Sequence, residues 1–379
     1  MEKVHRENWE WHCRDPRQLD EWFSDREQLA VLNSVKANSV RKVFTVDDAY
    51  YVKQENITRF SARVKNKFSN KAKREFDAAL KLENADVPCV RYLGWGFSQT
   101  DCMLFTETFK NAISADEYYW NTLFYRPEKR EEFLIVLTDF LKRFFNAGFD
   151  HPDLHLGNLL LNPETMQLKL VDVYGVRARR TNPHKRAQRL GPILSSLRDW
   201  LSTQRAAKII LELGVASSPV KAQQAWIGMI KKDAKRMNRN YAKRLKQLIN
   251  GKSKHLFPTT EDICFANRSV APLDYDGVIA EPDKFLIRYK YSEFDAAALL
   301  QLTLRLRMHH LNHLQAIVNH EDEVYFDVEP DKHIIPSEAS INYFNLGCRL
   351  ANLPEQKADN LFYYKGMVFI RDIRPLIPG

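Results

Sequence analysis

The chain has 379 residues, 44% of them hydrophobic and 28% charged, which is the composition of a globular protein with room for two or three domains. No apolar run reaches the roughly 18 residues that a membrane-spanning helix needs, because the most apolar candidate, residues 133–145, is interrupted by polar and charged side chains. The N-terminal segment has no apolar signal core, and the five cysteines form no Cys-x-x-Cys pair. We therefore expect a cytoplasmic protein with reduced thiols.

The formal net charge of the chain is +9. Such a charge favours phosphate-rich partners, which are nucleic acid, an anionic membrane surface or an anionic substrate. A basic surface that is simply solvated would explain the charge equally well. The positions of the charges along the chain must decide between these interpretations.

The first elements are predicted as a helix and a hairpin. Residues 1–30 are charged and rich in tryptophan, and Asp15 before Pro16 is a plausible N-cap, so we predict a short helical lead-in. Residues 31–56 alternate polar with β-branched and aromatic side chains, which predicts an antiparallel hairpin. Lys53 lies at the end of its second strand.

A helix is predicted over residues 70–84, where apolar side chains recur at helical spacing. Its Glu75 is the natural partner for Lys53, although two unrelated surface charges would give the same sequence. Residues 89–109 then predict two further strands, the second of which ends at Glu107.

Two more helices are predicted, over residues 116–125 and 130–148, and the second is strongly periodic and stops at Gly148. It leads directly into residues 149–177, FDHPDLHLGNLLLNPETMQLKLVDVYGVR. The two apolar runs of this stretch, separated by Asn-Pro-Glu-Thr, predict a loop followed by a β-hairpin over 159–173.

This stretch carries the chemistry that the sequence predicts. Asp153 and Asp172 lie about twenty positions apart with Asn158 between them. Phosphoryl transfer from a nucleotide needs one carboxylate to orient or deprotonate the acceptor hydroxyl, and an amide and a second carboxylate to hold the metal on the phosphates. The stretch therefore indicates a kinase.

Basic side chains are concentrated in two segments after Asp172. The first has no acidic residue and contains Arg177, Arg179, Arg180, Lys185, Arg186 and Arg189. Helices are then predicted over 190–214 and 219–250. One face of the second is apolar, and the other carries a single acidic residue, Asp233, among Lys231, Lys232, Lys235, Arg236, Arg239, Lys243, Arg244 and Lys246.

Residues 258–379 predict an α+β extension to which no chemistry is assigned. Strands are expected over 285–291, 324–328 and 361–370, and a helix over 293–319. That helix would place His309 and His313 on one face, but neither the zinc-protease pattern nor a nearby cysteine accompanies them. A polar helix face explains these histidines better than a metal site does.

The order and spacing of Lys53, Glu75, Asp153, Asn158 and Asp172 resemble those of the protein-kinase-like superfamily. Within it, the block AKREFDAALKLENADVPCVRYLGWG, the loop DLHLGN and the strand LVD are similar to those of bacterial lipopolysaccharide core sugar kinases, the heptose and Kdo kinase group. Aminoglycoside and choline kinases share the loop. The resemblance implies ATP-dependent phosphorylation of an inner-core sugar at the cytoplasmic face of the inner membrane.

The fold that the resemblance implies is bilobal and α+β. It would consist of an N-terminal lead-in (1–30), an antiparallel-sheet N-lobe (31–109), a helical C-lobe (110–257) and the α+β extension (258–379). ATP and Mg²⁺ are the implied cofactors.

The resemblance also implies roles for single residues. Asp153 would be the catalytic residue that accepts the proton of the acceptor hydroxyl, and Asn158 and Asp172 would hold Mg²⁺. Lys53, fixed by Glu75, would pair with the inner phosphates. The remaining nucleotide contacts would come from Lys36 in the phosphate loop and from Glu107 and Phe109 in the linker at the adenine edge.

The substrate is inferred from the neighbouring charges. Arg177, Arg179 and Arg180 would bind the carboxylates and phosphates of an anionic acceptor, and the basic helix 231–246 would rest on an anionic membrane. A cationic aminoglycoside would need an acidic site instead. Nucleic acid is not an expected partner, because the basic face lacks interleaved aromatic residues and a known module.

Three departures from the superfamily pattern keep alternatives open. Pro152 replaces the arginine of regulated protein kinases, the Asp-Phe-Gly position reads Asp172-Val173-Tyr174-Gly175, and no glycine precedes Gly94. The phosphate loop, residues 33–39, is therefore not glycine-rich. A kinase of a small molecule or of a protein hydroxyl, or a pseudokinase scaffold, remains an alternative to a sugar kinase.

Overall fold

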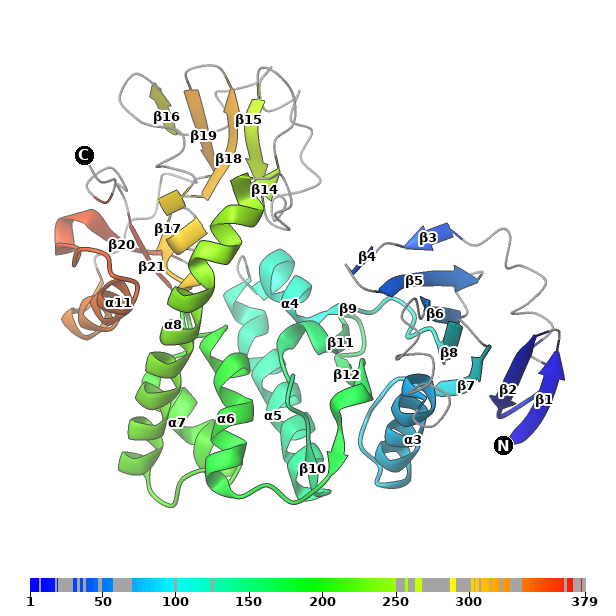
Figure 1. The fold of residues 1–379 in the computed structure, drawn as a ribbon. Coiled ribbons are helices and arrows are strands. Elements are labelled where there is room, and N and C mark those ends of the chain that lie inside the picture. The colour runs from blue at the N-terminus through cyan, green and yellow to red at the C-terminus, as the bar shows by residue number, and fades with distance from the viewer. Residues whose placement is uncertain are drawn as a thin grey trace. The chain divides into compact units, whose positions relative to one another are not determined.

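The computed structural model (Figure 1) describes residues 1–19, 30–56, 70–249, 256–267, 287–290, 301–327, 336–370 and 376, with breaks at 7, 18, 33–34, 37–38, 47–49, 99–100, 124–125, 258–262, 303, 307, 314, 321–322 and 365–366. The chain divides into two compact units. One consists of Met1–Tyr119 and Glu128–Arg189, and the other of Trp120–Pro127 and Leu190–Gly379.

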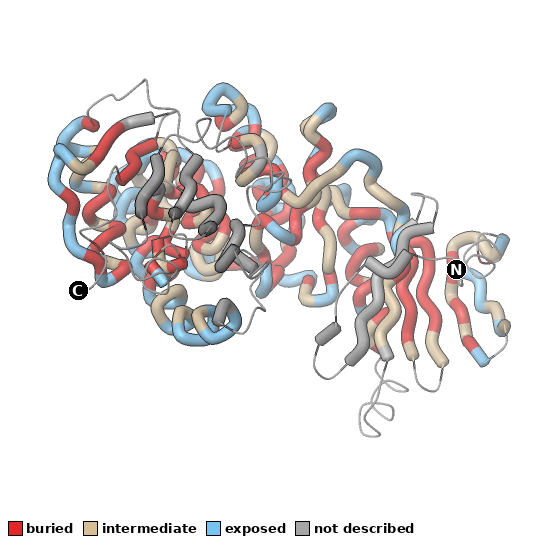
Figure 2. The backbone as a smooth tube through the Cα atoms, turned by 90° about the horizontal axis from the view of Figure 1, so that it is seen from above, coloured by how far each residue is buried: buried red, intermediate tan, exposed pale blue. Residues whose placement is uncertain are grey.

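The first unit begins with an antiparallel sheet whose strands follow the order β1-β2-β7-β8-β6-β5-β3, with β4 paired to β5. The bounds are β1 Glu2–Arg6, β2 Trp9–Cys13, β3 Ala30–Leu32, β4 Val35–Lys36, β5 Ser39–Val46, β6 Tyr50–Asn56, β7 Tyr92–Phe97 and β8 Asp101–Glu107. The predicted hairpin is confirmed as β5–β6, and Lys53 is paired with Val43 on one side and Leu104 on the other. The central strands β7 and β8 are buried along most of their length (Figure 2).

The start of the chain differs from the prediction. Residues 2–13 form the hairpin β1–β2, which pairs with β7, and not a helix. Most of the predicted helical lead-in after Asp15, residues 20–29, lies outside the described residues. The reason is the alternation in WEWHC, which buries Trp9, Trp11 and Cys13 on one face of β2. Trp11 packs flat on Gly96, where any Cβ atom would lie 2.3 Å from the indole ring.

The predicted helix after the hairpin is confirmed as α3, Lys71–Asn84. Asn70 caps its N-terminus, since its side-chain oxygen accepts hydrogen bonds from the backbone N–H groups of Ala72 (2.8 Å) and Lys73 (3.2 Å). The buried face of α3 contains Phe76, which is fully buried, and Glu75, which is 2% exposed. A charged residue is thus held on the apolar face of the helix.

The rest of the first unit supports the loop that carries Asp153. The elements are β9 Ile113–Ser114, α4 Ala115–Tyr118 with a π-helical turn Tyr119–Leu123, α5 Arg130–Asn146, β10 Phe149–Asp150, β11 Leu159–Asn162, β12 Gln167–Leu170 and β13 Arg177–Ala178. The predicted hairpin is confirmed as β11–β12, and its turn is closed by Asn162, whose side chain accepts from the N–H groups of Glu164 and Thr165. Helix α5 ends as predicted before Gly148, which has a φ of 81°.

The helices that follow are α6 Pro183–Ser195, α7 Thr203–Glu212 and α8 Pro219–Ile249. The prediction of one helix over 190–214 is wrong, because the chain leaves α6 after Ser195 and Ser202 starts a new helix by accepting from the N–H of Arg205 (3.2 Å). The predicted helix 219–250 is confirmed.

The remainder of the second unit is α+β, as predicted. Its elements are β14 Leu256–Phe257, β15 Ile263–Asn267, β16 Ile287–Lys290, β17 Asn312–His313, β18 Gln315–His320, β19 Glu323–Asp327, α11 Glu338–Leu350, β20 Leu361–Tyr364 and β21 Met367–Ile370. The strands form two sheets, β14-β15-β18-β19-β16 and β17-β21-β20. One core cluster lies beneath α11 and β20–β21, and Met237, Tyr241 and Leu245 of α8 pack against it.

The predicted helix 293–319 is wrong over its last part, because residues 312–313 and 315–320 are strands. The β-branched pair Ile317-Val318 lies in β18, which pairs with β15 and β19. His309 is therefore not on a helix face with His313. It is buried, its Nε2 lies 3.0 Å from Asn238 Oδ1, and burial and nearby arginines lower its pKa to about 3.

The α+β fold class is confirmed: an antiparallel sheet with α3 between its strands is followed by a short linker, helices and the hairpin β11–β12. This is the order of elements expected for the protein-kinase-like fold.

Candidate active site

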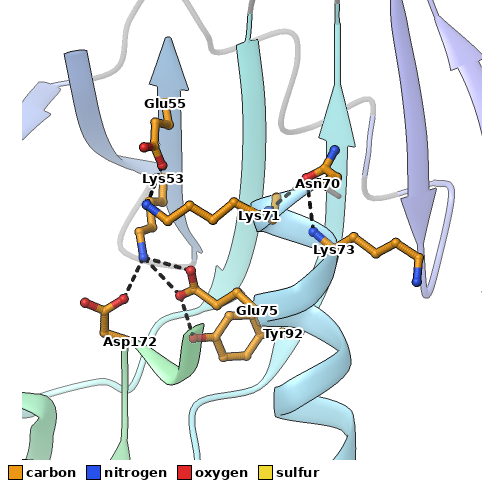
Figure 3. Close-up of polar contacts among 9 residues, drawn as sticks. Lys53, Glu55, Asn70, Lys71, Lys73, Glu75, Tyr92 and Asp172 are labelled. Atoms are coloured by element: carbon orange, nitrogen blue, oxygen red, sulfur yellow. Dashed lines mark hydrogen bonds and ion pairs between the residues drawn. The ribbon is translucent and has the colours of Figure 1, made fainter. Parts of the chain in front are cut away.

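Three predicted residues meet in one ion cluster of the first unit (Figure 3). The Nζ atom of Lys53 lies 3.0 Å from both carboxylate oxygens of Glu75 and 2.9 Å from Oδ1 of Asp172. These residues come from β6, from α3 and from the segment after β12, and Lys53 and Asp172 are 119 positions apart in the sequence. The folding of the chain, and not local sequence, brings them together.

The Glu75 carboxylate is the buried member of this cluster. Its side chain is 3% exposed, against 18% for Lys53 and 41% for Asp172. A buried carboxylate is costly unless it is paired and hydrogen-bonded. Besides Lys53, Glu75 accepts a hydrogen bond from the hydroxyl of Tyr92 at 3.2 Å.

Tyr92 was not predicted from the sequence as a site residue. It is buried in β7, and burial, followed by the neighbouring Glu75 carboxylate, raises its pKa well above the ordinary value. The hydroxyl therefore stays protonated and can donate. The sequence indicates only that a tyrosine lies in a predicted strand. This strand, β7, pairs with β8, which in turn pairs with β6.

Asp172 has an unusual backbone. Its φ and ψ are 54° and 50°, in the left-handed region that most residues avoid. The preceding N–H, of Val171, donates to the carbonyl of Asn158 (2.9 Å), and the following Val173 is fully buried. The left-handed residue lies between these two fixed positions, and its carboxylate reaches Lys53.

The loop before β11 holds Asp153 and Asn158. The side-chain Nδ2 of Asn158 donates to the backbone carbonyl of Asp153 at 2.9 Å, which closes the loop. The Asp153 side chain is 83% exposed, and Nε2 of His155 lies 3.9 Å from its Oδ2. The Asp153 carboxylate is therefore open to an incoming molecule while its backbone is fixed.

His151 supports this loop from beneath. It is 2% exposed, and its Nδ1 accepts a hydrogen bond from the backbone N–H of Asp153 at 3.2 Å. Burial lowers the pKa of His151, against the opposing effect of Asp153. The imidazole is thus neutral at neutral pH, with Nδ1 as acceptor, and it fixes the backbone of the residue that carries the carboxylate.

Arg189 holds the strand that leads into the loop. Its guanidinium donates to both carboxylate oxygens of Asp150, at 2.6 and 3.2 Å, and to the carbonyl of Pro152 at 3.4 Å. Burial alone would raise the pKa of Asp150, but the pairing with Arg189 outweighs it and leaves the pKa lowered. One member of the predicted basic segment is therefore structural.

The other arginines of this segment remain at the surface. Arg177, Arg179 and Arg180 are exposed, and Arg177 is paired with Asp150 in the short ladder β10–β13. With the residues that the structure describes, none of the three guanidinium groups forms a hydrogen bond or ion pair. The structure thus places them beside the strand that enters the Asp153 loop, but not in contact with the Lys53 cluster.

The predicted linker follows β8. The N–H of Glu107 donates to the carbonyl of Arg91 (2.8 Å), and Lys169 lies over the ring of Phe109 at 4.4 Å. The linker is thereby attached to β12 of the hairpin. Lys36 lies in β4, and its side chain is outside the part of the chain that the structure describes.

Tyr174 lies two residues after Asp172, in the turn that precedes β13. Its hydroxyl accepts a hydrogen bond from Arg74 at 2.7 Å, and the cations of Arg74 and Lys71 lie 5.0 and 5.1 Å from the ring centre. Cation–π pairs of this kind are worth about 0.5–1 kcal/mol at exposed sites. Tyr174 therefore links α3, which carries Glu75, to the turn that follows Asp172.

The donor set fits a magnesium ion bound together with nucleotide phosphates. Because Asn158 uses Nδ2 to donate, its Oδ1 is left as an acceptor, and the Asp172 carboxylate is part exposed. Mg²⁺ prefers such oxygen ligands and usually takes one or two carboxylates, with phosphates and water completing its shell. Within the described ranges, no group of three or more His, Cys, Asp or Glu side chains could hold a metal by itself.

Comparison with known proteins gives one family match. The model of the lipopolysaccharide kinase (Kdo/WaaP) family matches residues 17–212. No curated protein matches the chain. Among solved structures, the chain is similar to the crystal structure of an aminoglycoside-3′-phosphotransferase of type VIII, with 14% sequence identity, 55% of this chain and 98% of that chain covered, and a TM-score of 0.37. The family match spans more than half of the chain and contains the whole Lys53 cluster.

Proposed function

Because the chain belongs to the lipopolysaccharide kinase (Kdo/WaaP) family and is thereby an ATP-dependent phosphotransferase, we propose that it phosphorylates a hydroxyl group of an inner-core sugar, heptose or Kdo. The observation that carries this proposal is the cluster of Lys53, Glu75 and Asp172, together with the exposed carboxylate of Asp153. These are the groups that hold nucleotide phosphates and receive a proton in phosphoryl transfer.

In the proposed reaction, Asp153 accepts the proton of the acceptor hydroxyl. The oxygen of that hydroxyl forms a bond to the γ-phosphorus of ATP, the bond from this phosphorus to the β–γ bridging oxygen breaks, and ADP leaves. Asp153 suits this role because its carboxylate is 83% exposed while its backbone is held by Asn158 and His151. A fixed base within hydrogen-bond reach contributes about 10²–10⁴-fold to such a step.

Lys53 pairs with the inner phosphates in this proposal. Its ammonium group is oriented by Glu75, and Glu75 is oriented by Tyr92. Asn158 and Asp172 would hold Mg²⁺, which supplies positive charge to the phosphates when it is bound. Preorganised charges of this kind stabilise the transition state without reorganisation during the reaction.

The acceptor is proposed to be anionic because exposed arginines lie beside the strand that leads into the Asp153 loop. Arg177, Arg179 and Arg180 are exposed next to β10, the strand that leads to Asp153. Guanidinium groups bind carboxylates and phosphates in two-pronged geometry, and Kdo and phosphorylated heptose carry those groups.

We also propose that α8 brings the enzyme to the cytoplasmic face of an anionic membrane. The basic residues predicted on its outer face are exposed, whereas Asp233 is buried and bound to Arg236 at 2.5 Å. Each basic residue near an anionic leaflet contributes about 1 kcal/mol to the free energy of membrane binding. Within the described ranges, every helix is too short or too polar to cross a bilayer.

Mass spectrometry of the core oligosaccharide tests the substrate. Cells that lack the gene should lose one phosphate from the core, and the sugar that loses it identifies the acceptor. An unchanged core would exclude the proposed substrate. With purified enzyme and core acceptor, charge reversal of Arg177, Arg179 and Arg180 should raise the KM for the acceptor and leave the KM for ATP unchanged.

The membrane contact has its own test. The purified chain should sediment with anionic vesicles at low salt and be released at high salt, and glutamate replacements of Lys235, Arg239 and Lys243 should weaken this binding. Equal binding to neutral vesicles would contradict the proposal. Reversal of Lys3, an exposed lysine on β1, is the matched control.

A further inference from the structure

The second compact unit contains a cavity of about 330 Å³ that the proposed reaction does not use. Its wall includes the segment 198–204, the start of α11 and one turn of α8. One part of the lining is polar and includes Arg198, Ser202 and Ser340, whereas Ile230, Phe344 and Val368 supply apolar surface. Small-molecule sites typically have volumes of about 300–1,000 Å³ and this mixture of surfaces.

Arg198 is the residue of this cavity that indicates a ligand. It is 7% exposed, and its Nη2 has no hydrogen-bond partner among the described residues. Burial lowers the pKa of the guanidinium, but arginine remains charged in proteins. A buried cation without a hydrogen-bonded counter-ion is costly.

In the described part of the chain, neither nearby carboxyl group forms a hydrogen bond or salt bridge with Arg198, although the charge of Asp233 acts on it at longer range. Asp233 is bound to Arg236. Asp199 lines the cavity, and burial raises its pKa well above the ordinary value, against weaker opposing hydrogen bonds from backbone groups. Burial thus favours the neutral form of Asp199, and within the described residues no hydrogen-bonded carboxylate balances the positive charge of Arg198.

The N-terminus of α7 adds hydrogen-bond donors at the same wall. Ser202 caps the helix through Arg205 N–H, but in the described part of the chain the N–H groups of Thr203 and Gln204 have no acceptor. Both residues line the cavity. The first N–H groups of a helix and its dipole favour an anion at this end.

From these two independent features, we propose that this cavity binds a small organic anion with an apolar body. The anionic head, a carboxylate or a phosphate monoester, would meet Arg198 and the first turn of α7. The apolar body would lie against Ile230, Phe344 and Val368. This proposal does not depend on the identity of the sugar acceptor, since the residues of the two sites are different.

Isothermal titration calorimetry of the full-length chain tests this proposal with four probes: hexyl phosphate, hexanoate, inorganic phosphate and hexanol. At least one of the two organic anions should bind saturably, and more tightly than both inorganic phosphate and hexanol. Whichever of them binds more tightly identifies the head group. Saturable binding of neither organic anion would overturn the proposal, as would hexanol or inorganic phosphate binding equally well.

Variants locate the site. Arg198→Met keeps the length of the side chain and removes the charge, and it should weaken anion binding about tenfold or more, the effect expected for a hydrogen bond to a charged group. Lys208→Met removes an exposed charge from the same helix α7 and should bind normally. Unchanged binding by Arg198→Met would place the anion elsewhere and overturn the assignment.

A third variant keeps the proposal testable if Arg198→Met does not fold. Ala339 is exposed in the first turn of α11 and lines the cavity, so Ala339→Trp should fold and obstruct binding. If Arg198→Met does not fold, unchanged binding by Ala339→Trp overturns the proposal. Asp153→Asn, which changes the proposed kinase site, should bind the anion normally, so that failure of one proposal is distinguishable from failure of the other.

Discussion

Lys53 Nζ lies 2.9 Å from Asp172 Oδ1 while it also contacts both oxygens of Glu75. One ammonium group thus joins a carboxylate that is almost fully buried to one that is part exposed. The two carboxylates depend on the Lys53 cation to different degrees. Glu75 needs Lys53 for its own stability, whereas Asp172 has solvent as an alternative.

Lys53→Met should therefore lose both activity and stability. Leaving the buried Glu75 carboxylate without its cation should lower the free energy of unfolding by about 3 kcal/mol, measured by urea denaturation, and phosphotransfer should fall to background. The double variant Lys53→Met, Glu75→Leu should recover stability without activity. Lys73→Met is the matched control, because that lysine is 54% exposed and pairs with Asp77 of the same helix, and its effect should stay within about 0.5 kcal/mol.

Tyr92→Phe tests the hydrogen bond behind Glu75. Removing the hydroxyl should cost about 1 kcal/mol of stability and raise the KM for ATP, because the Glu75 carboxylate loses the group that orients it. Equal KM and stability in the variant would show that the Tyr92 hydroxyl does not position Glu75. Tyr119→Phe, another buried tyrosine on a different element, provides a comparison for the loss of a buried hydroxyl.

Asp153→Asn should separate chemistry from folding. The side chain is 83% exposed, so the unfolding midpoint should not change. The rate of phosphate transfer to the acceptor should fall about 10²-fold or more, because the amide cannot accept the proton. A variant that keeps its rate would require another base, and His155, whose Nε2 lies 3.9 Å from Asp153, is the first to replace.

The Asp150–Arg189 pair predicts a pH dependence of stability. The pKa of Asp150 is lowered in the folded protein, so folding favours the ionised form. The stabilisation is fully present above the ordinary pKa of aspartate, about 4, and is lost as the pH falls through the lower folded value. Arg189→Met should cost about 2 kcal/mol at pH 7, and the difference from the unmodified chain should shrink below pH 4. A constant difference down to pH 3 would contradict this account.

The parts of the fold that sequence predicted well are those whose pattern is local. The periodic face that contains Phe76 identifies α3, and the turn at Asn162 identifies β11–β12. The pairing of Lys53 with Glu75 was predicted from the order in which the superfamily's site residues occur along the chain. Hydrophobic periodicity alone cannot indicate such a long-range pair. Their roles in catalysis stay predictions until the variants above are measured.

The errors also have physical causes. A plausible N-cap at Asp15 favours a helix near the start of the chain, whereas the alternation in Trp9–Cys13 produces a strand. Residues 315–320 follow a turn and the short strand β17, and their pairing with β15 and β19 makes them a strand. Tyr92 and His151 act through buried hydrogen bonds to other residues, and no single sequence can indicate such partners.

The hairpin β1–β2 protects one edge of the sheet. Strand β1 carries Glu2, Lys3, His5 and Arg6 in a mostly solvent-facing strand, and charges on an outer strand discourage pairing with a strand of another molecule. Behind it, the apolar sequence YLGWGF of β7 is covered by β2. Removal of residues 1–13 would turn β7 into the outermost strand and open its apolar sequence to pairing with a strand of another molecule.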